Sequence, residues 1–147
     1  MGSISVSGIG CAALIAASAA SSAAAAEIEV QVQGLRNQQG MVRLCLTRNP
    51  AHFPDCNGDP AALKRSVRAG EAASIRFTSV GAGTYALSVI HDENGNGRLD
   101  RFLAIPREGF GFSRNPAIRM GPPRFEDVRF DVAAARVRQP VRIKYLL

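Results

Sequence analysis

Hydrophobic and polar residues alternate with a period of two along most of the chain beyond residue 26. This alternation is typical of β-strands with one buried and one solvated face, whereas an amphipathic helix repeats about every 3.6 residues. The clearest example lies at the start, where Ile28, Val30 and Val32 share one face. The pattern predicts strands within residues 27–35, 41–47, 73–80, 84–90, 126–132 and 141–146.

Turn-forming residues separate the predicted strands, and the chain contains no internal repeat. Segments rich in Gly, Pro, Asn and Gln lie at 36–40, 81–83 and 121–123. Residues 59–67 fit either a short helical turn or a further strand. Short strands joined in this way favour an all-β fold. We predict one domain over residues 27–147, a single antiparallel β-sandwich of about seven strands, Ig-like or prealbumin-like.

The first 26 residues differ in composition from the rest, because they contain no charged residue and end in a run of alanines. An apolar stretch at 8–17 precedes the small-residue pattern of a cleavage site at 24–26. These features predict that residues 1–26 are a signal peptide, although no Lys or Arg precedes the apolar stretch. The stretch is too short and too rich in Ser and Ala for a membrane span. We therefore expect an exported protein, periplasmic or extracellular, whose mature form has no transmembrane segment.

The chain carries 18 Lys and Arg residues against 12 Asp and Glu, a formal net charge of +6. The cations are scattered, and nearly all are Arg, which indicates the solvated outer faces of strands. No basic run is interleaved with aromatic residues, so we expect no nucleic-acid partner. Long-range attraction to anionic envelope surfaces is compatible with this charge. We expect a monomer whose partner is an envelope protein, a peptide or a glycan.

Removal of Cys11 with the signal peptide leaves Cys45 and Cys56. The strand alternation places Cys45 on the face opposite the apolar side chains of 41–47. An even cysteine count in an exported chain favours a disulfide. Closing so short a loop contributes about 2–3 kcal/mol in the chain-entropy model. The alternative is a metal site that adds His52 and His91 to the two thiolates, although the chain lacks the C-x-x-C spacing of zinc sites.

Residues 91–100, HDENGNGRLD, place oxygen-bearing groups at alternate positions, as a calcium-binding loop does. Leu103 stands at the twelfth position, where a glutamate normally completes the shell, and Glu108 is the nearest later carboxylate. The affinity expected of such a site is weak, about 10⁻⁴–10⁻³ M. The candidate calcium ligands are Asp92, Asn94, Asn96, the carbonyl of Arg98, Asp100 and Glu108, with Gly97 at the turn.

A metal-free explanation of the same loop remains open. Asn94-Gly95 and Asn96-Gly97 are both signals for tight hairpin turns. Side chains of Asn and Asp also cap turns without any ion. The residues alone therefore predict either a calcium loop or a structural turn between strands.

The stretch from His91 to Asn115 resembles a family of small exported bacterial proteins known only as a domain of unknown function. The shared pattern reads approximately H-D-x-N-x-N-G-x-x-D followed by G-x-P-x-E-G-x-G-F-S-x-N, with Ala104 here in place of its first Gly. Residues 76–89 are similar to carboxypeptidase-regulatory-like and prealbumin-like sandwiches, which implies a binding module more than an enzyme. Besides the candidate calcium ligands, the pattern contains His91, Gly97, Pro106, Gly109, Phe110, Gly111, Phe112, Ser113 and Asn115.

No motif for nucleophilic catalysis is present, so we expect no enzymatic activity. The leading hypothesis is a non-catalytic module of the cell envelope with a weak calcium loop at 92–100. An alternative is a metal-free adhesion or scaffold module that binds a peptide or glycan through residues 109–112, GFGF. Phe110 and Phe112 either are buried and cover the sandwich, which we favour, or are exposed and form a small aromatic platform. A third hypothesis is a hydrolase acting through His91 and Ser113.

Overall fold

The computed structural model describes residues 2–3 and 24–147. The predicted signal peptide therefore lies almost wholly outside the described residues, and β1 begins at its last residue, Ala26. Three short helical turns are η1 (Pro50–His52), η2 (Ala69–Glu71) and α1 (Phe125–Val128). The strands are β1 (Ala26–Gln33), β2 (Met41–Thr47), β3 (Leu63–Arg68), β4 (Ser74–Val80), β5 (Gly83–Asp92), β6 (Arg101–Phe102), β7 (Ile105–Pro106), β8 (Gly109–Phe112), β9 (Phe130–Val132) and β10 (Arg136–Arg142).

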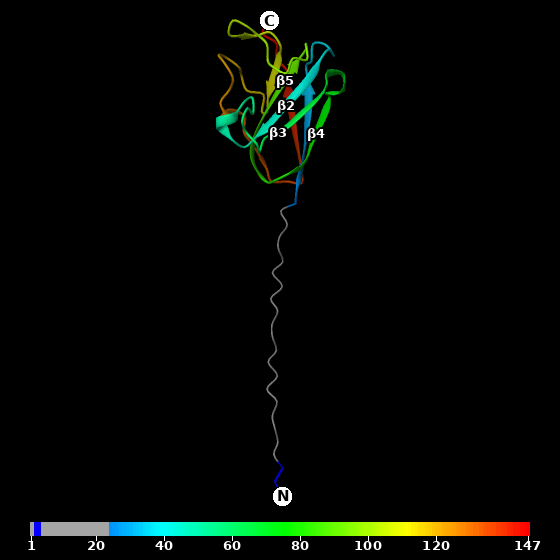
Figure 1. Ribbon diagram of the computed structural model, residues 1–147, viewed down its shortest axis with the longest axis vertical. Helices are drawn as coiled ribbons and strands as arrows, with labels where there is room; N and C mark the ends of the chain where they lie inside the picture. The colour runs from blue at the N-terminus through cyan, green and yellow to red at the C-terminus, as the bar shows by residue number, and fades with distance from the viewer. Residues whose placement is uncertain (1, 4–23) are drawn as a thin grey trace.

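Two sheets form the body of the molecule (Figure 1). One has the strand order β10-β1-β4, and the other has the order β3-β2-β5-β8, with β9 paired to the start of β5. Apolar side chains of both sheets make one buried cluster, which includes Ile28 and Val30 of β1 and Leu44 and Leu46 of β2. The predicted all-β sandwich is confirmed. One pair, β1 with β10, is parallel, which the sequence did not predict.

The early strands agree with the sequence pattern, since β1, β2, β4 and β5 lie within or close to the predicted ranges. Residues 59–67, whose sequence fits either a helical turn or a strand, contain most of strand β3. The two last predictions were wrong in part. Residues 125–128 form α1 because the Arg124 N–H and the Asp127 carboxylate close a helical turn, and only 130–132 are a strand. Strand β10 begins earlier than predicted, where Arg136 and Arg138 reach the carboxylates of β1.

A second buried cluster lies on the outer face of the β2–β5–β8 sheet. Phe110 and Phe112 point to this face and are only 5% and 7% exposed. This burial confirms the favoured alternative, in which the two rings cover the sandwich, and contradicts the alternative of an exposed platform for a sugar or peptide. The cluster consists of Ala86, Phe110, Phe112, Phe125 and Val128, covered by Phe53 and Ile118.

The glycines of β8 allow the C-terminal segment to lie against its inner face. A Cβ atom at Gly109 would come within 2.5 Å of Ile143 and Tyr145, and one at Gly111 within 2.7 Å of Val141. Phe110 exchanges two backbone hydrogen bonds with Lys144 at this contact. The glycines are thus needed for packing, and the contact connects the two sheets.

The candidate loop lies at the end of the sandwich where β1 and β5 finish. The chain end, the β6–β7 hairpin and the link between β1 and β2 lie at this same end (Figure 1). The fold therefore brings residues 34–40, 93–108 and 143–147 together, although they are far apart in the sequence.

Candidate functional site

The carboxylate of Asp92 is the buried anchor of the loop at 92–100. Its side chain is completely buried. Oδ2 accepts hydrogen bonds from Nε of Arg43 at 2.6 Å and from the N–H of Gly97 at 2.8 Å, and Oδ1 accepts one from the N–H of Asn96 at 3.0 Å. Burial alone would raise the pKa of Asp92, but the bonds from Arg43, Gly97 and Asn96 together hold the pKa below its ordinary value. Asp92 is therefore ionised at neutral pH.

The side chains of Asn94 and Asn96 meet at the carboxylate of Asp100. Nδ2 of Asn96 donates to both carboxylate oxygens of Asp100 at 2.9 Å, and Nδ2 of Asn94 donates to Oδ2. These bonds, that of Asn96 first, hold the pKa of Asp100 below its ordinary value. The amide oxygens of Asn94 and Asn96 accept the N–H groups of Asn96 and Arg98. The convergence places the third, fifth and ninth positions of the predicted calcium loop around one point.

Glu108 clamps the two ends of the loop. Its carboxylate is almost completely buried, and it accepts the N–H of Glu93 on one oxygen and the N–H of Asp100 on the other, both at 3.0 Å. The sequence suggested Glu108 as the missing ligand. In the structure its oxygens bind main-chain N–H groups on either side of the loop, so its role here is to fix the loop's width.

The donor set was compared with the needs of calcium, which takes about 6–8 oxygen ligands. Asp100 offers two carboxylate oxygens. Half-turn rotations of the Asn94 and Asn96 amides would direct two amide oxygens toward an ion held there, since amide oxygen and nitrogen have nearly the same shape. Oδ1 of Asp92 accepts a single N–H and keeps a lone pair. The positive charge of Arg43 opposes a cation. Among the described residues, no three His, Cys, Asp or Glu side chains form a metal-binding group. Any cation held by this loop would therefore be bound weakly and would need water molecules to complete its coordination shell.

A polar network beside the loop was not found by sequence reasoning. Arg36 donates to both carboxylate oxygens of Glu93 at 2.7 and 2.8 Å, and this interaction, more than any other, holds the pKa of Glu93 low. Arg36 also stacks on the ring of Tyr145, at 4.5 Å, and donates to the main-chain oxygen of Leu147. Arg36 and Arg43 therefore correct the expectation that the scattered arginines are solvated. A single sequence gives no signal for these long-range pairs.

His91 and Ser113 do not form a catalytic pair. His91 is fully buried, with Nε2 at 2.8 Å from the carbonyl of Gln39 and Nδ1 at 2.7 Å from the hydroxyl of Tyr145. The carbonyl only accepts, so Nε2 donates to it, and both ring nitrogens have a hydrogen-bond partner. Burial raises the pKa of Tyr145. Ser113 is equally buried and donates to the carbonyl of Val128 at 2.6 Å. A hydrolase built on these two residues does not fit the structure.

The remaining motif residues have structural contacts. Asn115 donates to the carbonyl of Pro140 at 2.9 Å and accepts the N–H of Arg142 at 2.7 Å, which attaches the segment after β8 to β10. Pro106 pairs with Arg101 in the β6–β7 hairpin. The motif from His91 to Asn115 therefore forms the 92–100 loop, the β6–β7 hairpin and the attachment of β8 to β10.

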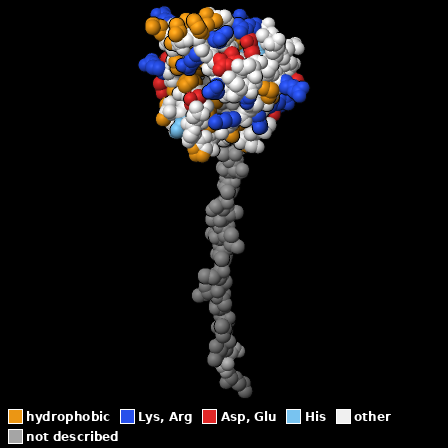
Figure 2. All heavy atoms as spheres, turned by 45° about the horizontal axis from the view of Figure 1, so that its top comes forward, with side chains coloured by type: hydrophobic (Ala, Val, Ile, Leu, Met, Phe, Trp, Pro, Cys, Tyr) orange, Lys and Arg blue, Asp and Glu red, His pale blue; other side chains and the backbone are white. Residues whose placement is uncertain are grey.

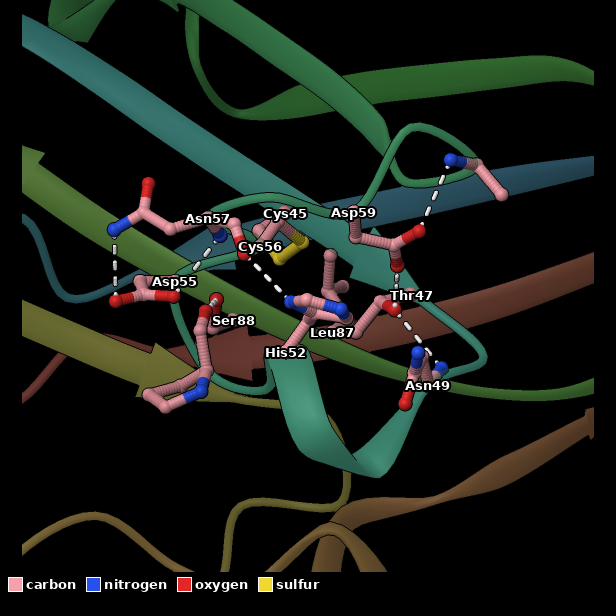
Figure 3. Close-up of a disulfide and its surroundings, with 12 residues drawn as sticks. Cys45, Thr47, Asn49, His52, Asp55, Cys56, Asn57, Asp59, Leu87 and Ser88 are labelled. Carbon is pink, nitrogen blue, oxygen red and sulfur yellow. Dashed lines mark hydrogen bonds between the residues drawn. A yellow bond between two sulfur atoms is a disulfide. The ribbon is translucent and has the colours of Figure 1, made fainter.

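The predicted disulfide is present between Cys45 and Cys56, with Cα atoms 6.0 Å apart (Figure 3). The alternative metal site is wrong, because both sulfur atoms are bonded to each other and Nδ1 of His52 lies 2.6 Å from the carbonyl of Asn57. A hydrogen bond from Ser88 to the carbonyl of Pro54 adds a second attachment. The disulfide therefore holds the loop over the outer face of β2 and β5.

Comparisons with known proteins were made for the whole chain. No curated protein and no solved structure matches it, so the similarity to prealbumin-like sandwiches stays a prediction. In the part of the chain that the structure describes, no helix is long and apolar enough to cross a membrane. The model of the family described as "Uncharacterized protein conserved in bacteria (DUF2141)" matches residues 30–139. The match covers most of the chain, and the protein belongs to this uncharacterised bacterial family.

Proposed function

We propose that this protein is an exported, non-catalytic module of the cell envelope whose loop at 92–100 binds calcium weakly. The observation that carries the proposal is the convergence of Asn94 and Asn96 on the carboxylate of Asp100. Without an ion, the two amides supply the hydrogen-bond donors that the carboxylate needs. With an ion, the same side chains would turn their oxygens inward.

The electrostatics set the affinity range. Two carboxylates, Asp92 and Asp100, would face the ion, and one of them already pairs with Arg43. Calcium sites tighten as more charged ligands are added to a rigid loop. A site with one uncompensated carboxylate belongs to the weak class, with a dissociation constant of about 10⁻⁴–10⁻³ M. Such a site is useful where calcium is plentiful, as it is outside the cytoplasm.

The second candidate is a metal-free scaffold in which the loop is a structural turn. Its support is the completeness of the internal hydrogen bonding, since no buried side-chain nitrogen or oxygen of the described residues lacks a partner. The ion pair between Arg43 and Asp92 supports it as well. The two candidates differ in one respect that can be measured, which is whether millimolar calcium stabilises the fold.

Calorimetric titration of the purified protein with calcium chloride tests the proposal. We expect saturable heat in the millimolar range and, at calcium about ten times the dissociation constant, about 1.4 kcal/mol of added stability. Asp100→Asn should abolish both, because it removes the uncompensated carboxylate. The matched control is Asp55→Asn, which should leave both unchanged, because Asp55 is an exposed aspartate whose carboxylate, like that of Asp100, accepts a side-chain N–H of an asparagine in its own loop. Absence of heat and of stabilisation in the unaltered protein would establish the metal-free scaffold instead.

A further inference from the structure

The β6–β7 hairpin displays apolar side chains to solvent at the same end of the sandwich as the candidate loop. Phe102 is 58% exposed, Leu103 86% and Ile105 43%. Hydrophobic side chains gather at the upper end of the molecule in Figure 2, beside Lys and Arg. We refer to residues 102–105 as the apolar tip. Contiguous exposed apolar residues usually mark an interaction site, whereas single exposed ones do not.

The backbone at the apolar tip gives a second, independent observation. Leu103 has a φ of 57°. Two-residue hairpin turns with positive φ favour Gly, Asn and Asp, because a larger side chain crowds the backbone. Leucine is strained at this position and gains almost no burial within the fold. Folding therefore does not explain a leucine here, but a partner that covers the side chain would.

Three arginines surround the apolar tip. Arg98, Arg101 and Arg107 are exposed, and none of them takes part in an ion pair among the described residues. Their positive charges flank the apolar side chains on both sides in sequence. An apolar centre with a cationic rim is complementary to a surface that has an anionic outer layer over an apolar interior.

We propose that the apolar tip docks the protein on an anionic phospholipid bilayer. Phe102, Leu103 and Ile105 enter the boundary between headgroups and acyl chains, where aromatic and aliphatic side chains of peripheral proteins bind. The arginines contact the phosphate groups, and each basic residue near such a surface adds to binding. A bilayer can also accept a small apolar tip without a preformed pocket.

A second copy of the chain is a less suitable occupant. Two tips placed against each other would bring arginines of both copies together, and like charges repel. The tip is also small, whereas a stable protein interface buries about 800 Å² on each partner. The surface therefore fits a bilayer better than it fits another tip.

Vesicle sedimentation tests the proposal with the purified protein. The probes are phosphatidylcholine vesicles, with and without about one third phosphatidylglycerol, at low and high salt. We expect binding to the anionic vesicles only, weakened by salt. Leu103→Asn should reduce the partition coefficient at least about tenfold. Because asparagine tolerates positive φ, this variant should fold at least as well as the unaltered protein.

Matched controls separate the apolar tip from general surface properties. Met120 is 96% exposed on another loop, so Met120→Asn should leave binding unchanged. The double variant Arg101→Gln/Arg107→Gln should weaken binding more than Lys64→Gln/Arg68→Gln, which removes the same charge from the exposed strand β3. Equal binding by Leu103→Asn and the unaltered protein would overturn the proposal. So would concentration-dependent dimerisation that Leu103→Asn abolishes, in the absence of vesicle binding.

The apolar tip does not depend on the proposed calcium site. Vesicle binding should persist in the presence of a chelator, and Leu103→Asn should keep the heat of calcium binding. Loss of calcium binding in Asp100→Asn with vesicle binding retained would therefore leave the tip proposal standing. Absence of vesicle binding, with calcium heat present, would overturn the tip proposal alone.

Discussion

Two loops of this protein use similar short sequences but are held by different forces. In residues 55–59, DCNGD, the Asp side chains accept main-chain N–H groups two residues later. In residues 92–97, DENGNG, Asp and Asn side chains accept main-chain N–H groups two to five residues later. The first loop is closed covalently by Cys45 and Cys56. The second is closed by charge, through Arg43, Asp92 and Glu108. Similar turn chemistry therefore occurs in one loop that is closed by a covalent bond and in one that is closed by hydrogen bonds to charged groups.

Removal of the disulfide should have the largest effect on stability. Cys45→Ala/Cys56→Ala should lower the free energy of unfolding by about 2–3 kcal/mol, because the open chain regains the entropy of the loop. Urea denaturation of the purified variant measures this. Calcium heat should be unchanged, since the second loop shares no bond with the disulfide. A variant that loses calcium binding together with the disulfide would show that the loops are coupled.

Loss of Arg43 should have the second largest effect on stability. Arg43→Gln leaves the buried carboxylate of Asp92 without its charged partner, which should lower the free energy of unfolding by about 1–3 kcal/mol. We expect a value in the lower half of this range, because Arg43 is itself one-third exposed. The disulfide loop should keep its structure. Urea denaturation measures the loss, and calcium titration should show equal or tighter binding, because the opposing cation is gone. Weaker calcium binding in Arg43→Gln would contradict the proposed ligand set.

Acid should destabilise the charged loop, which holds three carboxylates with lowered pKa values, more than the 55–59 loop, which holds one, that of Asp59. Asp92, Glu93 and Asp100 all have pKa values below their ordinary ones in the folded state. Such groups contribute stability above the unfolded pKa, about 3.9 for Asp and 4.3 for Glu, and the contribution is lost as pH falls through the folded pKa. We expect thermal denaturation curves to shift down progressively below about pH 4. The disulfide-free variant should show the same pH dependence, and a flat profile would contradict the charge-based account.

The smallest expected difference in stability is that between the variants of Asn96 and Asn57, one asparagine from each loop. Asn96→Ala removes donors to Asp100 and the acceptor for the N–H of Arg98, so it should cost about 1 kcal/mol. Asn57→Ala removes one side-chain donor in the covalently closed loop and should cost less than about 0.5 kcal/mol. Chemical denaturation of the pair measures the difference. Equal losses of stability would show that the loop with the disulfide needs its side-chain hydrogen bonds as much as the other loop does.

Local pattern was sufficient for the parts of the fold governed by a single strand. Alternation located β1, β2, β4 and β5 because apolar residues recur at every second position on the face toward the main core, although the outer face of β5 is buried as well. It also placed Cys45 opposite Leu44, which indicated the disulfide. Alternation failed at Val128 because that residue is buried in the second cluster by α1, not by a strand. A period-two pattern does not distinguish these two ways of burying one residue.

The candidate site could be predicted only in its local part. The Asp and Asn spacing between 92 and 100 is contiguous in sequence, and the structure brings those side chains together. Arg43 and Arg36 reach the loop from other elements, 49 and 57 residues away from their partners. Nothing in the residues around these arginines indicates their partners. Their contribution depends on strand pairing, which only the fold determines.

An NMR titration with calcium tests the central claim most directly, because it reports on both loops in one experiment. Backbone amide signals of the ¹⁵N-labelled protein would be followed up to about 10 mM calcium, well above the expected dissociation constant. The account predicts saturable shifts at Asn96, Gly97 and Arg98, with those at Asn57 and Ala61 unmoved. Absence of shifts in the 92–100 loop, or equal shifts in both loops, would contradict the calcium site.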